Sequence, residues 1–293
     1  MERVTQNLND LWPDVRAVTY RENRLEPKLE VDSMKEIGVV VPTIGQRPEY
    51  LPKALKSIRE SGSAYILLVG NKGFDAKGLK DAGLIDRYID EEDPGLAAKI
   101  NFGFRCLPSE IKYINWLGDD DMLTPNSLIT SLQRIQKPDQ PVLVFGGCEY
   151  IDSEGNKIFV NRSGSWAPGL LRFGPQLIPQ PGALYRRDAF EKVGGLNKDL
   201  GWAFDFELFL SLSKIGKTAY VPEILSRFRW HAGSLSVSRR AESVAEASKV
   251  RVSQLPKILR PISFLWEYPV RVATYLAGKR VSKKLSKSIA RNK

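Results

Sequence analysis

Three consecutive aspartates, Asp119 to Asp121, are the residues of this sequence best suited to chemistry. They follow a short apolar run, Tyr113–Leu117, after one glycine, Gly118. Carboxylates this close repel one another and are costly near a core unless positive charge lies among them. Oxygen ligands on a tight turn suit a hard cation, Mg²⁺ or Mn²⁺, which is commonly shared with substrate phosphates. The pattern indicates either a metal site or an acidic turn in which the last aspartate or Thr124 caps the next helix, with Pro125 at its first position.

A second group of polar residues lies far along the chain. Asp205 and Glu207 fall near the start of a predicted helix, and His231 is the only histidine. A carboxylate at a helix start is either a general base or a helix cap. Glu207 is two positions after Asp205 and therefore faces another side of the helix. His231 is either a site residue or a hydrogen-bonded structural histidine.

Alternating strands and helices must position these groups. β-branched and apolar runs predict strands, and helical spacing predicts the segments between them. Such alternation predicts right-handed βαβ units and a doubly wound sheet. The predicted strands are Ile37–Thr43, Tyr65–Val69, Ile85–Ile89, Tyr113–Leu117 and Val142–Phe145, and the predicted helices are Leu51–Ile58, Gly95–Phe104 and one from Thr124.

Ligands bind beyond the carboxyl ends of the strands in such sheets. Thr43, Gly70-Asn71 and the three aspartates all fall at such ends. This agreement favours a site over a solvated acidic turn. The later part of the chain predicts a hairpin over Tyr150–Val160, a mobile loop over Gly164–Gly182, a short helix Arg186–Val193 closed by Gly194-Gly195, a helix Trp202–Ile215, an extended run Val221–Trp230, and helices beyond Ser238 with breaks near Pro261 and Pro269.

Composition is that of an ordinary globular protein. The 293 residues are 42% hydrophobic and 27% charged, and the two cysteines have no metal-ligand or disulfide spacing. The polar N-terminus is unlike a signal peptide, and no apolar run is long enough to span a bilayer. We therefore expect a reducing, cytoplasmic setting.

The net charge of +10 is concentrated at one end. Seven basic residues follow Gly278 with no acidic residue among them, which leaves +3 for the rest of the chain. Together with the lack of common nucleic-acid-binding motifs, this argues against a nucleic-acid partner.

The order of several short motifs resembles the family 2 glycosyltransferases of GT-A fold. The resemblance runs from about Ile37 to Ser236. Each motif is weak alone, but six of them occur in the family's order with similar spacing. The motifs are Val40–Thr43, Asn101 with Gly103, Trp116–Asp121, Tyr185–Gly195, Ala203–Leu208, and Arg229–His231 with Ser234.

The resemblance implies a Rossmann-like, mainly parallel mixed sheet flanked by helices, and inverting sugar transfer assisted by Mn²⁺ or Mg²⁺. The donor would be a nucleotide-diphosphate sugar, with a UDP-sugar favoured, and the acceptor a glycan or a lipid-linked hydroxyl. Asp205 matches the catalytic base. Asp121 matches the direct metal ligand, with Asp119 and His231 also expected at the metal or the diphosphate. The expected substrate-binding residues are Pro42, Thr43, Arg47, Gly70, Asn71, Lys99, Asn101, Asp119, Asp120 and Glu207.

Some positions depart from the family pattern. Gly70-Asn71 stands where many relatives have an acidic residue, Ile44-Gly45 follows Thr43 where many have asparagine, and Gly118 stands where many have aspartate. Two other functions are consistent with the residues. A sugar-nucleotidyltransferase would show a Gly-rich, Arg-containing loop after the first strand, which Pro42–Arg47 matches poorly. A non-catalytic nucleotide-sugar or glycan-binding relative is the other.

We predict three regions: an N-terminal appendage over residues 1–35, a GT-A domain over 36–236, and a helical, basic extension over 237–293. From Lys279 onward, Val281, Leu285 and Ile289 recur at i+4 among lysines. A basic helix with an apolar stripe is typical of segments that lie on anionic membranes, and aromatic residues upstream would add to this. The tail is therefore either a peripheral anchor at the inner face of the cell membrane or a solvated basic end.

Overall fold

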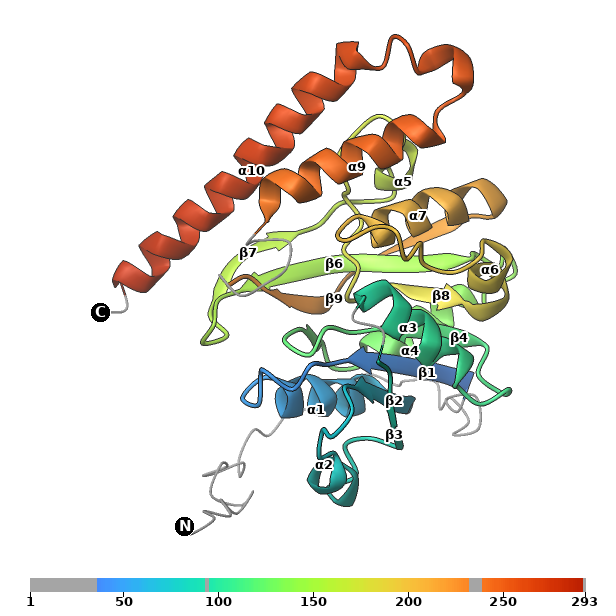
Figure 1. Ribbon diagram of the computed structural model, residues 1–293, viewed down its shortest axis with the longest axis vertical. Coiled ribbons are helices and arrows are strands. Elements are labelled where there is room, and N and C mark those ends of the chain that lie inside the picture. The colour runs from blue at the N-terminus through green and yellow to red at the C-terminus, as the bar shows by residue number, and fades with distance from the viewer. Residues whose placement is uncertain (1–35, 93–94, 232–238, 292–293) are drawn as a thin grey trace, which may run out of the picture. The chain divides into compact units, whose positions relative to one another are not determined.

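The computed structural model describes residues 36–92, 95–231 and 239–291 (Figure 1). The predicted N-terminal appendage, residues 1–35, and Ser234 lie outside them. The elements are β1 (Ile37–Pro42), α1 (Leu51–Ser61), β2 (Tyr65–Gly70), α2 (Lys77–Asp81), β3 (Arg87–Asp90), α3 (Leu96–Arg105), β4 (Tyr113–Trp116), β5 (Met122–Leu123), α4 (Ser127–Ile135), β6 (Leu143–Ile151), β7 (Lys157–Asn161), α5 (Ala167–Leu170), β8 (Leu184–Arg186), α6 (Arg187–Lys192), α7 (Phe204–Ile215), β9 (Thr218–Arg229), α9 (Arg240–Gln254), a 3₁₀ helix (Lys257–Leu259) and α10 (Phe264–Arg291).

Within the described ranges, nine strands form one mixed sheet. The strand order is β3-β2-β1-β4-β8-β6-β9-β5, and β7 pairs with β6. The first half of the sheet is parallel, because β1 pairs with β2 and β4, and β2 pairs with β3, all in the parallel sense. The second half is mostly antiparallel, although β6 and β9 run parallel. The predicted α/β fold with a mixed, helix-flanked sheet is confirmed.

Side chains of the central strands alternate between two apolar cores. Val40 of β1 packs in the core beneath α3 and α7, whereas Val39 and Val41 pack in the core beneath α1 and α4. Successive side chains of a strand point to opposite faces, so a strand covered on both faces must be apolar throughout. This is why the continuous β-branched run at 37–42 correctly predicts a central strand.

Two predictions about element ends are wrong. α4 begins at Ser127 with Asn126 as its N-cap, so neither Asp121 nor Thr124 caps it and Pro125 is not its first residue. This removes the helix-cap alternative for the aspartates. Pro269 does not break the C-terminal helix, because α10 continues through it to Arg291. A proline so near a helix start removes one intrahelical hydrogen bond, which the rest of this long helix tolerates.

Most of the remaining local predictions agree with the fold. β6 and β7 form the predicted hairpin, and Gly194 and Gly195 close α6 with left-handed φ angles of 86° and 77°. The stretch Gly164–Gly182 contains α5 rather than being loop throughout. No helix of the described residues is sufficiently long and apolar to cross a bilayer.

Of the C-terminal helices, α9 packs beside α7, and α10 runs antiparallel to α9 (Figure 1). A buried ion pair, Arg251 Nη2 to Glu267 Oε2 at 2.8 Å, joins α9 to α10. Ser282 of α10 receives hydrogen bonds from Trp230 and Arg240. The predicted helical C-terminal extension is therefore present, and its helix α9 packs against α7.

Candidate functional site

The first aspartate after β4 is held by the loop that follows β1. Thr43 Oγ1 donates to Asp119 Oδ2 at 2.7 Å, and Arg47 Nη1 donates to Asp119 Oδ1 at 2.8 Å. β1 and β4 are adjacent parallel strands, so their carboxyl ends meet at one edge of the sheet, as predicted. Both oxygens of Asp119 therefore accept hydrogen bonds that hold the loop, and its predicted metal ligation stays a prediction.

The other two aspartates are held by residues at the end of β9. Asp120 Oδ2 lies 2.9 Å from His231 Nε2 and 3.0 Å from Arg47 Nη1. Asp121 Oδ1 accepts the backbone N–H of Arg229 at 2.9 Å. The Arg229 side chain donates to the backbone oxygen of Asp120 and lies 4.4 Å from the centre of the Tyr50 ring. His231 therefore supports a carboxylate through Nε2.

Burial disfavours the ionised form of the carboxylates in this cluster. Removal from water raises the pKa of Asp119, even though Thr43 and Arg47 lower it. Burial, followed by the charge of Asp120, raises the pKa of Asp121 well above its usual value. Burial lowers the pKa of Arg47, but the three carboxylates outweigh it and the net pKa is raised. Arg47 is thus the cation that the sequence pattern required among the aspartates.

Gly118 leaves room between two carboxylates. A Cβ atom on Gly118 would lie 3.0 Å from Asp120 Oδ1 and 3.1 Å from Asp121 Oδ2, so the two oxygens border one small space. Among the described residues, no three His, Cys, Asp or Glu side chains form a metal-binding group. Mg²⁺ and Mn²⁺ often bind through only one or two carboxylates plus substrate phosphates. The pair Asp120 and Asp121 fits that kind of shared site.

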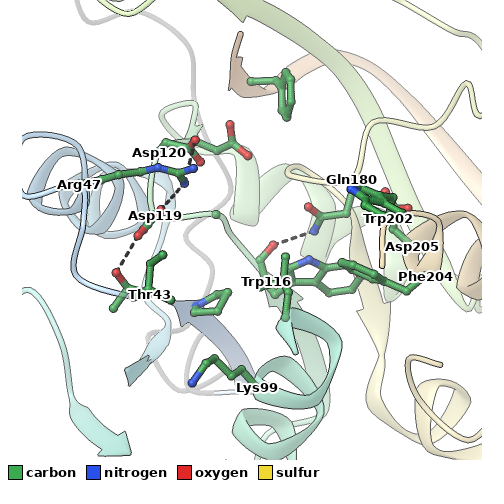
Figure 2. Close-up of a pocket in the computed structure, with 16 residues that line it drawn as sticks. Thr43, Arg47, Lys99, Trp116, Asp119, Asp120, Gln180, Trp202, Phe204 and Asp205 are labelled. Atoms are coloured by element: carbon green, nitrogen blue, oxygen red, sulfur yellow. Dashed lines mark hydrogen bonds and ion pairs between the residues drawn. The ribbon is translucent and has the colours of Figure 1, made fainter. Parts of the chain in front are cut away.

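A pocket of about 360 Å³ opens beside the aspartates. Figure 2 shows Asp119 and Asp120 on one side of it and Asp205 on the other. The lining residues are Pro42, Thr43, Ile44, Arg47, Leu96, Lys99, Trp116, Gly118, Asp119, Asp120, Asp121, Gln180, Trp202, Phe204, Asp205 and Phe228. Tertiary structure therefore joins Asp205 to a cluster that ends 84 residues earlier in the sequence.

Asp205 lies in the first turn of α7 and has two polar contacts. Gln176 Nε2 donates to its Oδ2, and the backbone N–H of Phe206 donates to its Oδ1, each at 2.7 Å. Burial raises the pKa of Asp205 to about 6, because the hydrogen bonds offset only part of the desolvation. A carboxylate with such a pKa accepts a proton more readily than an ordinary surface aspartate.

Lys99 is the buried cation on the pocket wall. Its side chain is 3% exposed, and its Nζ donates to the backbone oxygen of Glu91. An ammonium group has three N–H donors, so one backbone contact leaves it capable of binding phosphate oxygens.

Besides His231, which contacts Asp120, four predicted residues do not line the pocket. The side-chain amide of Asn101 binds the backbone N–H and C=O of Leu196, and Glu207 accepts hydrogen bonds from Ser211 and Gln254. Gly70 packs against Tyr88, whose hydroxyl donates to the backbone oxygen of Asn71. These contacts give the four residues structural roles, and their substrate binding stays a prediction.

Several residues at or beside the pocket were not predicted as site residues from the sequence. Gln176 and Gln180 lie in the Gly- and Pro-rich stretch, and Gln180 Nε2 donates to the backbone oxygen of Trp116 at 2.8 Å. Trp116, Trp202 and Phe204 form an aromatic wall of the pocket. Apolar and amide side chains of this kind occur throughout any core, so only their position identifies them.

The chain is similar in sequence to proteins named glycosyltransferases. An uncharacterized glycosyltransferase of Rickettsia conorii is 23% identical over 265 residues, which cover 85% of this chain and 43% of that protein. A second, from Rickettsia felis, is 24% identical over 68% of this chain and 34% of that protein. The chondroitin synthase of Escherichia coli is 22% identical over 52% of this chain and 22% of that protein. The chain spans less than half the length of these relatives.

Solved structures agree on the fold. A mannosyltransferase of Pyrobaculum calidifontis, in complex with GDP-Man and Mn²⁺, has a TM-score of 0.55 and 15% identity over 87% of this chain and 79% of that one. TarS of S. aureus has a TM-score of 0.53 and 9% identity over 84% of this chain and 55% of that one. No family model matches the sequence. The chain therefore has a glycosyltransferase fold and is similar, over most of its length, to proteins that are named glycosyltransferases.

Proposed function

We propose that this chain is an inverting, metal-dependent glycosyltransferase of the family 2 type. It would move a sugar from a nucleotide-diphosphate donor, with a UDP-sugar favoured, to a hydroxyl of a glycan or lipid-linked acceptor. The observation that carries the proposal is one pocket lined both by Asp119–Asp121 and by Asp205. The names of the relatives and the Mn²⁺ complex of the mannosyltransferase support it.

The donor half of the proposal rests on the acidic cluster. Asp120 and Asp121 would hold the cation, through the oxygens that border the space over Gly118. Bound there, Mn²⁺ or Mg²⁺ would act as a Lewis acid for the departing diphosphate. Lys99 adds a positive charge to the same pocket, where it would bind phosphate oxygens. Thr43 and Pro42 would lie beside the nucleoside.

The acceptor half rests on Asp205. Its carboxylate would remove the proton of the acceptor hydroxyl as that oxygen bonds to the sugar carbon and the bond to the diphosphate breaks. Gln176 holds one oxygen of the carboxylate in place. The aromatic wall of Trp116, Trp202 and Phe204 would exclude water from the reacting atoms.

Product analysis with a panel of nucleotide sugars tests the proposal. A thermal-shift screen with and without Mn²⁺ identifies the donor first, because a ligand that binds the folded state raises its stability. Release of nucleoside diphosphate together with glycosylated acceptor supports sugar transfer. Release of pyrophosphate instead would indicate a sugar-nucleotidyltransferase, and binding with neither product would indicate a non-catalytic relative.

Gly118→Ala tests the metal site without removing a carboxylate. The added methyl group would lie about 3 Å from both Asp120 Oδ1 and Asp121 Oδ2, in the space assigned to the cation. We expect the affinity for Mn²⁺ in the presence of donor to fall by about tenfold or more, because metal sites tolerate little displacement of their ligands. Isothermal titration calorimetry measures this affinity.

Gly169→Ala is the matched control, because a Cβ there meets no atom within 4 Å. Unchanged Mn²⁺ affinity in the Gly118 variant would contradict a cation in this space.

The outer face of α10 supports the predicted membrane contact. Leu265, Tyr268, Val272, Tyr275 and Leu276 recur at three- and four-residue spacing and are all exposed, Tyr268 by 73%. Glu267 and Ser282 lie on the inner face and bind α9, so the apolar stripe points away from the body. The basic run from Lys279 follows along the same helix. Apolar and aromatic side chains beside basic ones suit an anionic membrane surface, which a lipid-linked acceptor would require.

Tyr268→Glu tests this surface. The substitution adds a negative charge and removes an exposed aromatic ring, so we expect several-fold less protein to co-sediment with anionic vesicles, most clearly at low salt. Lys72→Gln is the charge-matched control, because it also lowers the net charge by one at an exposed position outside α10. Equal sedimentation of both variants and the wild type would contradict the assignment of this face.

A further inference from the structure

The backbone just before the candidate base is held by a glutamate of the C-terminal extension. Glu246 of α9 accepts three consecutive backbone N–H groups, from Gly201 at 3.0 Å and from Trp202 and Ala203 at 2.7 Å each. These residues lead directly into α7, which carries Asp205 in its first turn. Ala203 is buried and Trp202 is half-buried, and a backbone N–H that is removed from water needs an acceptor, which Glu246 provides from outside α7.

Glu246 therefore holds a segment that the pocket uses. Trp202, Phe204 and Asp205 all line the pocket, and Glu246 lies behind them and does not. Three charge-assisted hydrogen bonds to one carboxylate leave this segment little freedom to shift. A displacement of the segment would move the carboxylate of Asp205 relative to Asp120 and Asp121 across the pocket.

A second contact of α9 holds the other side of the base. Arg251 is 2% exposed, donates to Glu267, and donates through Nη1 to the backbone oxygen of Gly174 at 3.1 Å. Gly174 lies two residues before Gln176, the hydrogen-bond donor to Asp205. Arg251 also lies 5.7 Å from the ring centre of Phe206, the residue after Asp205. Both flanks of Asp205 are thus held from the same helix.

We propose that Glu246 is a positioning residue for the catalytic base, so that the C-terminal extension forms part of the active enzyme. This inference rests on the proposed role of Asp205. The extension would otherwise be only an anchor, and its removal would leave the reaction intact. The geometry instead makes α9 necessary for transfer, because it fixes the entry to α7 and the loop that carries Gln176.

The charge of Glu246 adds a measurable consequence. Its carboxylate is among the groups that raise the pKa of Asp205, after burial as the largest cause, because a nearby negative charge disfavours a second one. Tyr150 of β6 and Tyr185 of β8 also interact with Asp205, and burial raises the pKa of each phenol, which keeps both neutral near pH 7. Of these three neighbours of Asp205, Glu246 is the charged one, and a single substitution removes its charge.

Glu246→Gln in the full chain tests the inference. Glutamine offers one acceptor oxygen, and its NH₂ group faces backbone donors, so we expect kcat for transfer to fall about tenfold or more, while the KM for donor changes little. The acid limb of the kcat/KM profile should move to lower pH, because Asp205 loses a negative neighbour. A general loss of stability would not shift that limb. Glu246→Asp keeps the charge, so its acid limb should stay where it is in the wild type, although its shorter side chain should still lower kcat.

Glu242→Gln is the control, since it removes the same charge from an exposed position one turn earlier on α9. Glu246→Gln with the kcat and pH profile of the Glu242 variant would overturn the inference and leave the proposed function standing. If Glu246→Gln does not fold, Glu246→Asp decides, and wild-type kcat in that variant would also overturn it. A wild-type chain that releases no nucleoside diphosphate would instead contradict the proposed function.

Discussion

Asp205→Asn is expected to reduce sugar transfer by about 10²- to 10⁴-fold, the usual contribution of a general base. Asparagine has nearly the same shape and can still accept the hydrogen bond from Phe206, but it cannot take a proton from the acceptor hydroxyl. A base acts on the acceptor, so affinity for the donor and the metal should persist. Steady-state kinetics with donor and acceptor varied separately, together with titration of the donor, measure both effects.

The pH dependence of sugar transfer by the wild type should report the ionisation of Asp205. The pKa of Asp205 is raised to about 6, so kcat/KM should fall as the pH drops through about 6 and the carboxylate gains a proton. The residual activity of the Asp205→Asn variant should lack this limb. Stability should change with pH in the opposite direction to activity. A carboxyl group whose pKa is higher in the folded state binds more protons when the protein is folded. Its ionisation therefore destabilises the fold as the pH rises from about 4 to about 6. The asparagine variant should therefore be no less stable than the wild type at pH 7, which excludes unfolding as the cause of lost transfer.

Glu207→Gln is the matched control for Asp205→Asn. It makes the same chemical change two residues later on α7, where the side chain contacts Ser211 and Gln254 rather than the pocket. We expect a mild effect on turnover. A dead Glu207 variant beside an Asp205 variant of near wild-type rate would show that the base has been assigned to the wrong residue.

Asp121→Asn should abolish Mn²⁺-dependent donor binding, with a loss of more than about 100-fold, since changes even to the partners of metal ligands cost 10- to 100-fold. The amide oxygen can still accept the N–H of Arg229, so the turn should keep its shape, but an NH₂ group replaces one of the two oxygens beside Gly118. Isothermal titration of donor with and without Mn²⁺ measures the loss. Binding without metal should change far less.

Asp139→Asn is the control for Asp121→Asn. Asp139 pairs with Arg134 outside the pocket, so the same substitution there should leave Mn²⁺-dependent binding intact. If donor binding by the Asp121 variant depends on Mn²⁺ as in the wild type, the assignment of a cation to this cluster is wrong. The role of Asp121 would then be limited to its contact with Arg229.

Local sequence patterns predicted an element correctly where its residues are compatible with only one kind of backbone structure. The apolar run at 37–42 could be satisfied only by a strand buried on both faces, and the glycines after α6 have φ angles that other residues adopt at a cost. The order of strands and helices then placed Thr43 and the three aspartates at one edge of a parallel sheet. Neighbouring parallel strands have their carboxyl ends together, so this part of the site followed from the sequence.

Local signals failed where several turns or helix lengths were compatible with the same residues. Thr124-Pro125 reads as a helix start, yet α4 begins at Ser127, because Thr124 Oγ1 donates instead to the backbone of Ile224 in β9. Pro269 reads as a helix end, yet the packing of Glu267 and Ser282 on α9 holds α10 together across it. In both places contacts with distant segments outweighed a modest local preference.

Only the tertiary structure decided which partner each residue of the site contacts. Arg47 lies 72 residues before its partner Asp119, Gln176 lies 29 before Asp205, and His231 lies 111 after Asp120. Glu246 looks like any helix-surface glutamate in the sequence, but in the fold it holds the backbone that enters α7. A side chain's type sets which bonds it can make, whereas its partners depend on which distant elements pack beside it. The sequence therefore determined the carboxylates and their chemistry, and folding determined the cation, amide and glutamate that hold them in position.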